Sequence, residues 1–341
     1  MRRLGYYITN MGLLRFLLAL SVVIDHTGPI FGYHLISGKM AVQTFFILSG
    51  FYMALILNEK YVHQKNAFWL YISNRFLRIY PLYWLVLICT CIFLLMLKTF
   101  SDTFTQIPVT ELFIKNITIF ATTDYWWKSA TYNGLYVFQA WTLGLEFIFY
   151  LLAPVLVFRS WRSVFGLLLG SLMLRFVATH FVVFYPFEFI DRFFVTEICF
   201  FLFGILAYKI YAKPLFPLTQ IYTKYGKGII VLAICATLFF QFIPSGDIFA
   251  DNKFLWLYFL LIGSSLPAIF GITKKIIWDR LIGDLSYPIY ISHALLIDVA
   301  KSIWPQQSRN SWFSLGILIA VIFLAISLNE FLLKPTMRIL C

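Results

Sequence analysis

The sequence predicts an all-α, polytopic integral membrane protein with about ten transmembrane helices, and three observations support this prediction. Hydrophobic residues make up 61% of the chain and charged residues only 12%, whereas charged residues are about a quarter of an ordinary soluble domain. The apolar residues occur in runs of about 20, the length that crosses the hydrocarbon core of a bilayer. Lys and Arg collect in the short connections on one side of these runs, which by the positive-inside rule places the N and C termini in the cytoplasm.

We expect a single membrane domain over residues 1–341, with one long extracytoplasmic connection at about 99–137. In that connection the apolar segment Leu112–Phe120 predicts a short helix on or in the membrane surface. The aromatic cluster Tyr125–Trp127 suits either a platform for a sugar ring or an interfacial anchor. The predicted spans are residues 11–27, 39–57, 76–98, 138–158, 163–184, 192–211, 228–244, 254–272, 282–301 and 312–333.

The first predicted span carries ionisable residues inside an apolar run. Arg15 and His26 are eleven positions apart, so they lie within about 20° of one another on a helix and about 16 Å apart along it. Charged groups inside a bilayer are costly, and such residues usually serve function or pair tightly. The alternative is that Arg15 extends to the headgroups and His26 only caps the helix. Asp25 points about 100° away from His26 on the same helix.

The second and third spans add a small-residue notch and a pair of cations. Ser49 and Gly50 have almost no side chain, so another helix can approach there, which favours a packing notch. If that notch lay beside the first helix, it would help to position Arg15 and His26. Arg75 and Arg78 share a helical face, and two guanidinium groups on one face suit phosphate. Pro81, one turn later, predicts a break or kink in the helix. The alternative for the arginine pair is an ordinary positive-inside anchor.

The fourth span contains a single carboxylate, Glu146, on the same helical face as Thr142 and Tyr150. A carboxylate at this depth must be protonated, paired or turned to a polar cavity. We expect it to pair with His26, which would orient the imidazole as a general base. The alternative is a structural ion pair with Arg175.

Later spans carry further polar residues. Ser286, Tyr290 and His293 form a stripe at i, i+4 and i+7, which suits either the lining of a ligand site or hydrogen bonds between helices. Arg175 and Glu197 are isolated charges that pair either with one another or with the site.

Several function classes are disfavoured. The net charge of +12 comes from the short connections, where basic residues set topology, so we predict no nucleic-acid partner. The five cysteines show no metal-ligand spacing, and we predict no metal site. No nucleotide-binding loop, Gly-x-Ser-x-Gly or His-Glu-x-x-His motif occurs.

Taken together, these motifs resemble the membrane acyltransferase-3 family. The resemblance rests on Arg15 and His26, the segment Phe45–Phe51 with its Ser-Gly pair, Arg75-x-x-Arg78-x-x-Pro81, the Trp141…Glu146…Tyr150 pattern and the stripe from Ser286 to His293. Members of that family move acyl groups, commonly acetyl, onto extracytoplasmic sugars. The resemblance therefore implies a multi-pass O-acyltransferase of the bacterial inner membrane that modifies O-antigen, capsule or exopolysaccharide.

The resemblance also implies substrates and partners. Acyl-CoA, expected to be acetyl-CoA, is the donor substrate, and no cofactor is bound permanently. The acceptor is a glycan or a lipid-linked saccharide, and polysaccharide-assembly proteins are candidate partners beside the lipid bilayer.

Residue roles follow from the intramembrane charges and the resemblance together. The predicted catalytic residues are His26, Glu146 and Asp25, and those predicted to bind the coenzyme A phosphates are Arg15, Arg75 and Arg78. Predicted to line the substrate are Ser49, Tyr150, Ser286, Tyr290 and His293.

Two other functions compete with acyl transfer. A transporter or flippase would use the same charges as a proton or substrate pathway, but neither inverted repeats nor matched broken helices are evident. A non-enzymatic partner of a polysaccharide-assembly complex would need neither the Arg–His face nor the arginine pair.

Overall fold

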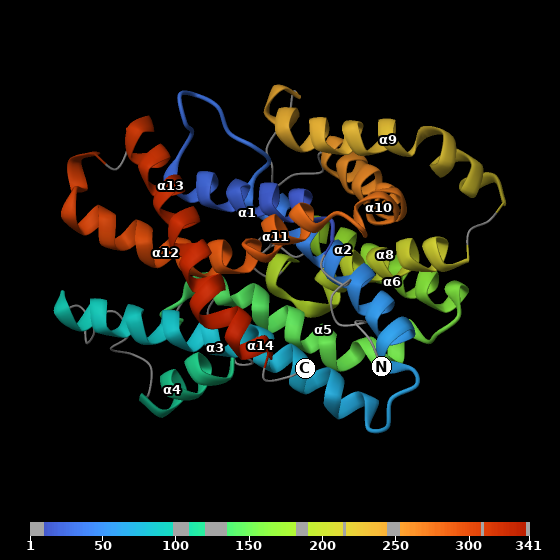
Figure 1. Ribbon diagram of the computed structural model, residues 1–341, viewed down its shortest axis with the longest axis horizontal. Coiled ribbons are helices and arrows are strands. Elements are labelled where there is room, and N and C mark those ends of the chain that lie inside the picture. Colours follow the sequence, from blue (N-terminus) through green and yellow to red (C-terminus); the bar gives the residue numbers. More distant parts are fainter. Residues whose placement is uncertain are drawn as a thin grey trace.

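The computed structural model describes residues 10–97, 109–119, 135–181, 190–213, 216–243, 253–307 and 310–338, and its regular structure there is helical (Figure 1). The helices within these residues are α1 Gly12–Thr27, α2 Gly38–Ile56, α3 Ala67–Met96, α4 Val109–Thr118, α5 Trp141–Val157, α6 Trp161–Phe181, α8 Phe194–Ala212, α9 Phe216–Phe239, α10 Lys253–Thr273, α11 Ile277–Asp284, α12 Ser286–Ile303, α13 Ser311–Leu328 and α14 Lys334–Arg338.

Eight helical stretches of the described residues are long and apolar enough to cross a membrane, which confirms an all-α, multi-pass membrane protein. The remaining two predicted spans correspond to α1 and α12. With 16 residues, α1 is about 24 Å long, shorter than the hydrocarbon core of about 30 Å. The eight stretches are Gly38–Tyr61, Ala67–Met96, Phe138–Val157, Trp161–Phe181, Phe194–Ala212, Lys224–Phe242, Phe254–Thr273 and Ser311–Thr336.

The helix α1 lies inside the bundle and packs against α2, α11, α12 and α13 (Figure 1). Its first turn is capped by another helix. Asp279 of α11 accepts hydrogen bonds from the backbone N–H groups of Gly12, at 2.7 Å, and Leu13, at 2.9 Å. Met11, at the N-cap position, has φ 61° and no capping side-chain bond of its own. The carboxylate of Asp279 therefore satisfies N–H groups that a helix start otherwise leaves unpaired.

The crossing of α2 and α8 depends on two glycines. A Cβ on Gly50 would lie 2.0 Å from the carbonyl oxygen of Phe201, and one on Gly204 would lie 1.9 Å from that of Ile47. Only glycine permits this backbone approach. The predicted packing notch is therefore confirmed at Gly50, and the helix that approaches it is α8.

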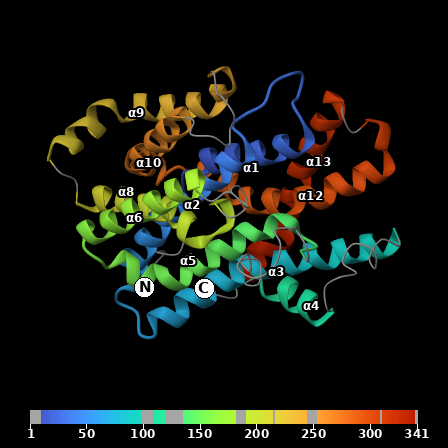
Figure 2. The ribbon, with the colours of Figure 1, turned by 180° about the vertical axis from the view of Figure 1, so that it is seen from behind.

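The helix α3 is longer than predicted and runs without interruption through Pro81, so the predicted break is wrong. A proline removes only one hydrogen bond from a helix, and contacts with neighbouring helices can offset that loss. Close to the proline, the hydroxyl of Tyr287 on α12 also donates to the carbonyl of Ile79 at 2.6 Å. Arg75 and Arg78 therefore lie inside a continuous helix, beside α5 (Figure 2).

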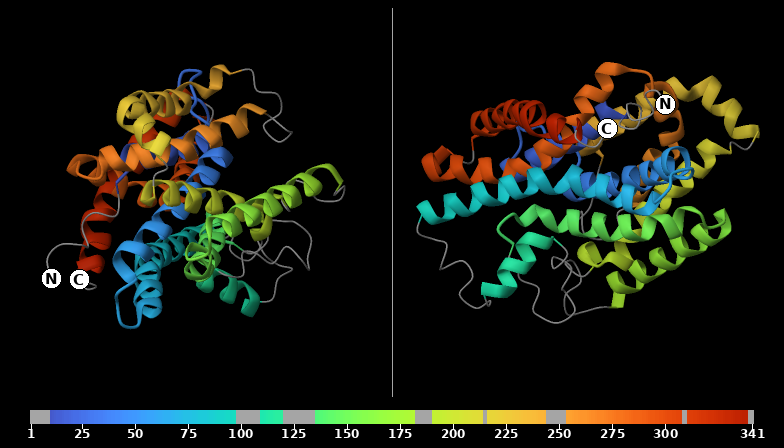
Figure 3. Two further views of the ribbon diagram at one scale, coloured as in Figure 1. Left: turned by 90° about the vertical axis from the view of Figure 1, so that its right-hand side faces the viewer. Right: turned by 60° about the horizontal axis from the view of Figure 1, so that its bottom comes forward.

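The short helix predicted in the long connection is confirmed as α4, at the margin of the bundle (Figure 3). The side chains of Tyr80, Tyr83 and Trp84 donate to the carbonyl groups of its last residues, 116–118. These aromatic residues of α3 thus pair carbonyls that a helix end leaves unsatisfied. The cluster Tyr125–Trp127 lies outside the described residues.

The isolated intramembrane charges Arg175 and Glu197 pair with one another, at 2.6 Å. Arg175 also contacts Asp191 at 3.1 Å, and Asp191 contacts Lys39 at 2.7 Å. This network joins α2, α6 and α8, and it leaves Arg175 committed to partners other than Glu146.

Candidate active site

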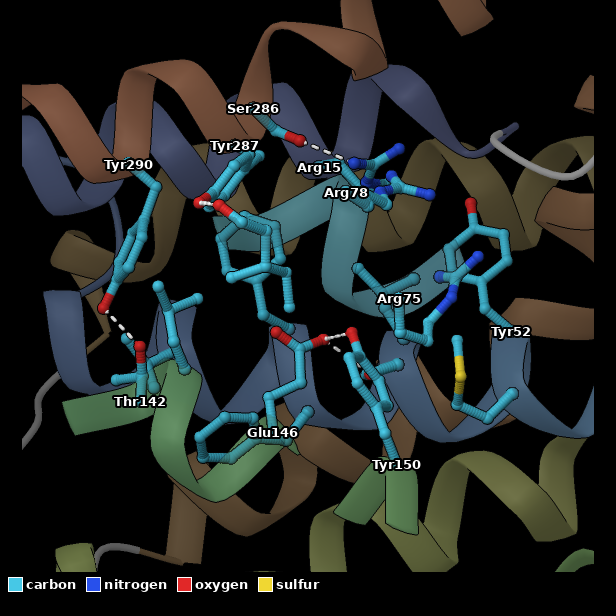
Figure 4. A pocket seen from close by; sticks show the side chains of 18 of the residues that line it. Arg15, Tyr52, Arg75, Arg78, Thr142, Glu146, Tyr150, Ser286, Tyr287 and Tyr290 are labelled. Atoms are coloured by element: carbon cyan, nitrogen blue, oxygen red, sulfur yellow. Dashed lines mark hydrogen bonds between the residues drawn. The ribbon is translucent and has the colours of Figure 1, made fainter. Parts of the chain in front are cut away.

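A cavity of about 120 Å³ lies among α1, α2, α3, α5 and α12 (Figure 4). Since one water needs about 10–15 Å³ on this measure, the cavity has room for several waters or a slim chain. It brings together eight of the eleven residues that were predicted for the site. These are Arg15, Ser49, Arg75, Arg78, Glu146, Tyr150, Ser286 and Tyr290.

Three arginines gather at one end of this cavity (Figure 4). Within the described residues, none of Arg15, Arg75 and Arg78 forms an ion pair with a carboxylate. Arg15 is only 7% exposed, and its Nη1 has no hydrogen-bond partner among these residues. Nε of Arg75 is also buried without a hydrogen-bond partner among the described residues. Uncompensated cations around one partly buried space repel one another, so the site favours an anion.

The sequence interpretation did not include Tyr52, which lies at this cationic end (Figure 4). Its hydroxyl is buried and has no partner among the described residues. The guanidinium carbon of Arg15 lies 6.0 Å from the centre of its ring. Its position three residues after Ser49 places both on one helical face, and this spacing would have identified it. Tyr52 thus adds an unpaired hydroxyl donor to the unpaired guanidinium N–H groups.

Glu146 lies in the middle of the cavity wall. Its Oε1 accepts hydrogen bonds from the hydroxyl of Ser49, at 2.8 Å, and from that of Tyr150. The ring of Tyr150 in turn lies 5.9 Å from the guanidinium carbon of Arg75. The prediction that Glu146 pairs with His26 is wrong, because the carboxylate turns to α2 and to its own helix instead. A pair of hydroxyl donors in reach satisfies it without an imidazole.

Thr142 and Tyr290 line the opposite end of the cavity. The hydroxyls of Thr142 and Tyr290 share a hydrogen bond of 2.8 Å (Figure 4). One turn later on α12, Nδ1 of His293 donates to the carbonyl of Tyr290 at 2.6 Å. The Nε2 of His293 lies 3.0 Å from Nδ1 of His26. The predicted site is therefore divided, since His26 and His293 stand beyond the cavity and connect to it through Tyr290.

Asp25 and His26 lie at the exposed end of α1, and their side chains contact different helices and loops. A Cβ on Gly38 would lie 2.8 Å from Oδ2 of Asp25, so the carboxylate packs against the first residue of α2. The positive end of a helix dipole favours a carboxylate there. His26 packs edge-on against Phe138, with ring centres 5.4 Å apart. No group of three or more His, Cys, Asp or Glu among the described residues is arranged to hold a metal ion.

The fold and the cavity define a multi-pass membrane protein built around a buried, cationic, hydroxyl-rich site. The chain belongs to the acyltransferase-3 family, since the model of that family, an acyltransferase domain, matches residues 8–330. The protein is therefore an acyltransferase. A relative from Acidianus two-tailed virus, named "Putative acetyltransferase ORF330", is 27% identical over 278 residues, which cover 76% of this chain and 73% of the relative. No solved structure matches the chain.

Proposed function

We propose that this acyltransferase moves an acyl group, acetyl in the first instance, from cytoplasmic acyl-CoA to a hydroxyl of an extracytoplasmic or lipid-linked glycan. The observation that carries the proposal is the group of three arginines without carboxylate partners among the described residues, around one cavity. Phosphate groups are the anions that guanidinium forks bind best, and coenzyme A carries several. Arg15, Arg75 and Arg78 would bind these phosphates, with Tyr52 as an additional donor.

The shape of the cavity supports binding of the two ends of the donor, its phosphates and its thioester, at opposite ends of the cavity. The cavity has room for part of the slim arm that carries the thioester. The phosphates would stay at the arginine end. The thioester would lie toward Thr142 and Tyr290, the part of the cavity wall that connects through His293 to His26.

The chemistry then needs one base at the acceptor. Nε2 of His26 takes the proton of the acceptor hydroxyl while the hydroxyl oxygen attacks the thioester carbonyl carbon. The carbon–sulfur bond breaks, and the leaving thiolate takes the proton back from His26. The products are the acylated glycan and free coenzyme A, with His26 unchanged. Glu146 acts by holding the hydroxyls of Ser49 and Tyr150 at the cavity wall.

We place the protein in a bacterial inner membrane with both termini in the cytoplasm, because a cytoplasmic thioester and an external hydroxyl must meet in the bundle. Polysaccharide-assembly proteins are the partners that such an acceptor implies. O-antigen, capsule and exopolysaccharide remain the acceptor classes proposed.

The test uses the full chain in lipid nanodiscs with acetyl-labelled acetyl-CoA and a purified bacterial surface polysaccharide. We expect label in the polysaccharide and release of free thiol, both abolished in His26→Ala. Arg162→Ala, which removes an exposed cation on α6, serves as the matched control and should retain activity. If the protein in sealed vesicles instead moves saccharide across the bilayer without transferring acetyl, the proposal fails in favour of a transporter.

A further inference from the structure

The tautomer of His293 follows from its surroundings. Its imidazole is 0% exposed, and Nδ1 lies 2.6 Å from the carbonyl oxygen of Tyr290. A carbonyl oxygen only accepts hydrogen bonds, so Nδ1 of His293 must carry a proton. No carboxylate contacts His293 among the described residues, and a buried imidazolium without a partner is costly. His293 is therefore neutral, and its Nε2 carries a lone pair.

That lone pair determines the tautomer of the neighbouring His26. Nε2 of His293 and Nδ1 of His26 are 3.0 Å apart, and the two rings are inclined by only 23°. This is a normal hydrogen-bond distance, and one of the two nitrogens must donate. Since Nε2 of His293 accepts, Nδ1 of His26 carries the proton. A neutral His26 then has its lone pair on Nε2, on the far side of the exposed ring.

We propose that His293 is a positioning residue: it holds His26 in the tautomer and orientation in which Nε2 is the free base. The hydrogen-bonded sequence runs from the carbonyl of Tyr290 through His293 to His26. This inference rests on the proposed function, in which Nε2 of His26 accepts the proton of the acceptor. Without His293 the ring of His26 would keep its backbone contact with Val22 but lose its partner on α12, so it would rotate and populate both tautomers, of which only one has its base at Nε2.

Tyr290 gives the arrangement a second consequence. Its hydroxyl bonds that of Thr142 in the cavity wall, while its carbonyl orients His293. Tyr290 therefore links the cavity wall to the histidine that orients the base.

The first test reads the tautomer directly and needs no substrate. Full-length protein with ¹⁵N-labelled histidine, in liposomes, is measured by solid-state NMR, which separates protonated from unprotonated ring nitrogens. The chain has five histidines, and His26→Ala assigns the signals of His26 by difference. We expect protonated Nδ1 and unprotonated Nε2 at His26, and mixed tautomers in His293→Leu. An unprotonated Nδ1 at His26 in the unsubstituted protein would overturn the proposal.

The second test uses activity and a conservative variant. His293→Leu should lower kcat by about 100-fold with little change in KM for acetyl-CoA, as expected for a misplaced base. His293→Gln, whose amide oxygen can accept from Nδ1 of His26, should recover most of that loss. The control His63→Gln changes an exposed histidine and should leave activity unchanged.

The outcomes separate this inference from the proposed function. If the unsubstituted protein transfers no acetyl, the proposed function fails. The tautomer of His26, measured without substrate, still tests whether His293 accepts a hydrogen bond from it. If His293→Gln and His293→Leu are equally impaired and His26 keeps one tautomer in both, His293 does not position it. Should His293→Leu fail to fold, His293→Gln and the spectrum of the unsubstituted protein still give the answer.

Discussion

Arg15 and Ser286 join α1 to α12 at the cationic end of the cavity, where Nη2 of the arginine donates to the serine hydroxyl at 2.8 Å. The serine hydroxyl donates in turn to the carbonyl of Gly283 at 2.7 Å, which directs its lone pair toward the guanidinium. One side of the guanidinium group is thus fixed by the protein, while its Nη1 has no partner among the described residues. An arginine held in this way is positioned for an anion before the anion arrives.

We expect Arg78→Ala to weaken coenzyme A binding by about 10- to 100-fold, since hydrogen bonds to charged groups contribute about 1.5–3 kcal/mol. Isothermal titration calorimetry in nanodiscs measures this Kd. Arg162→Ala removes the same charge from an exposed position outside the cavity and should leave the Kd unchanged. Equal Kd values of both variants for coenzyme A would contradict the assignment of the cavity as the donor site.

Tyr52→Phe tests the unpaired hydroxyl. We expect coenzyme A to bind about 3- to 10-fold more weakly, the effect of one neutral hydrogen bond, while the thermal stability of the ligand-free protein stays the same or rises. Tyr80→Phe is the matched control, because its hydroxyl bonds the carbonyl of Thr118. The control should lose stability and keep its affinity. Unchanged affinity in Tyr52→Phe would mean that the hydroxyl does not reach the ligand.

Gly50→Ala should greatly reduce the yield of folded protein, because the added methyl would lie 2.0 Å from a backbone oxygen of α8 that cannot move alone. Gly170→Ala in α6 is the control, since a Cβ there meets no atom of the described residues within 4 Å. Size-exclusion chromatography of detergent-solubilised protein compares the two. A monodisperse, normally abundant Gly50→Ala protein would contradict the close crossing of α2 and α8.

Asp279→Ala should lower the free energy of unfolding by about 1–2 kcal/mol, the usual effect of losing a helix cap. The residue accepts two backbone N–H groups at the start of α1, only a few residues before Arg15. Asp279→Asn keeps one acceptor oxygen and should fall between Asp279→Ala and the unsubstituted protein. Apparent Tm, followed by tryptophan fluorescence in detergent, measures the order. Equal Tm values for all three proteins would show that the cap contributes nothing.

Much of the cavity was predictable because a polar side chain inside a membrane has few places to go. Arg15, Glu146 and Tyr150 had to face either the interior or one another, since lipid cannot satisfy them. Helical periodicity then placed Thr142, Glu146 and Tyr150 on one face, and all line the cavity. Tyr52 could have been found by the same spacing, but a tyrosine in an aromatic-rich chain is not distinctive.

What the sequence alone determined is the class of protein and the set of polar residues that must be buried in its bundle. Hydrophobic run length and the cost of charge in lipid depend only on composition and spacing, so they can be evaluated before any folding. Only the tertiary structure decided which helix meets which: Gly50 packs on α8, Asp279 caps α1, and His26 contacts His293 rather than Glu146. These pairings depend on the relative shift and rotation of separate helices, which side-chain packing sets and which no periodicity within one helix encodes.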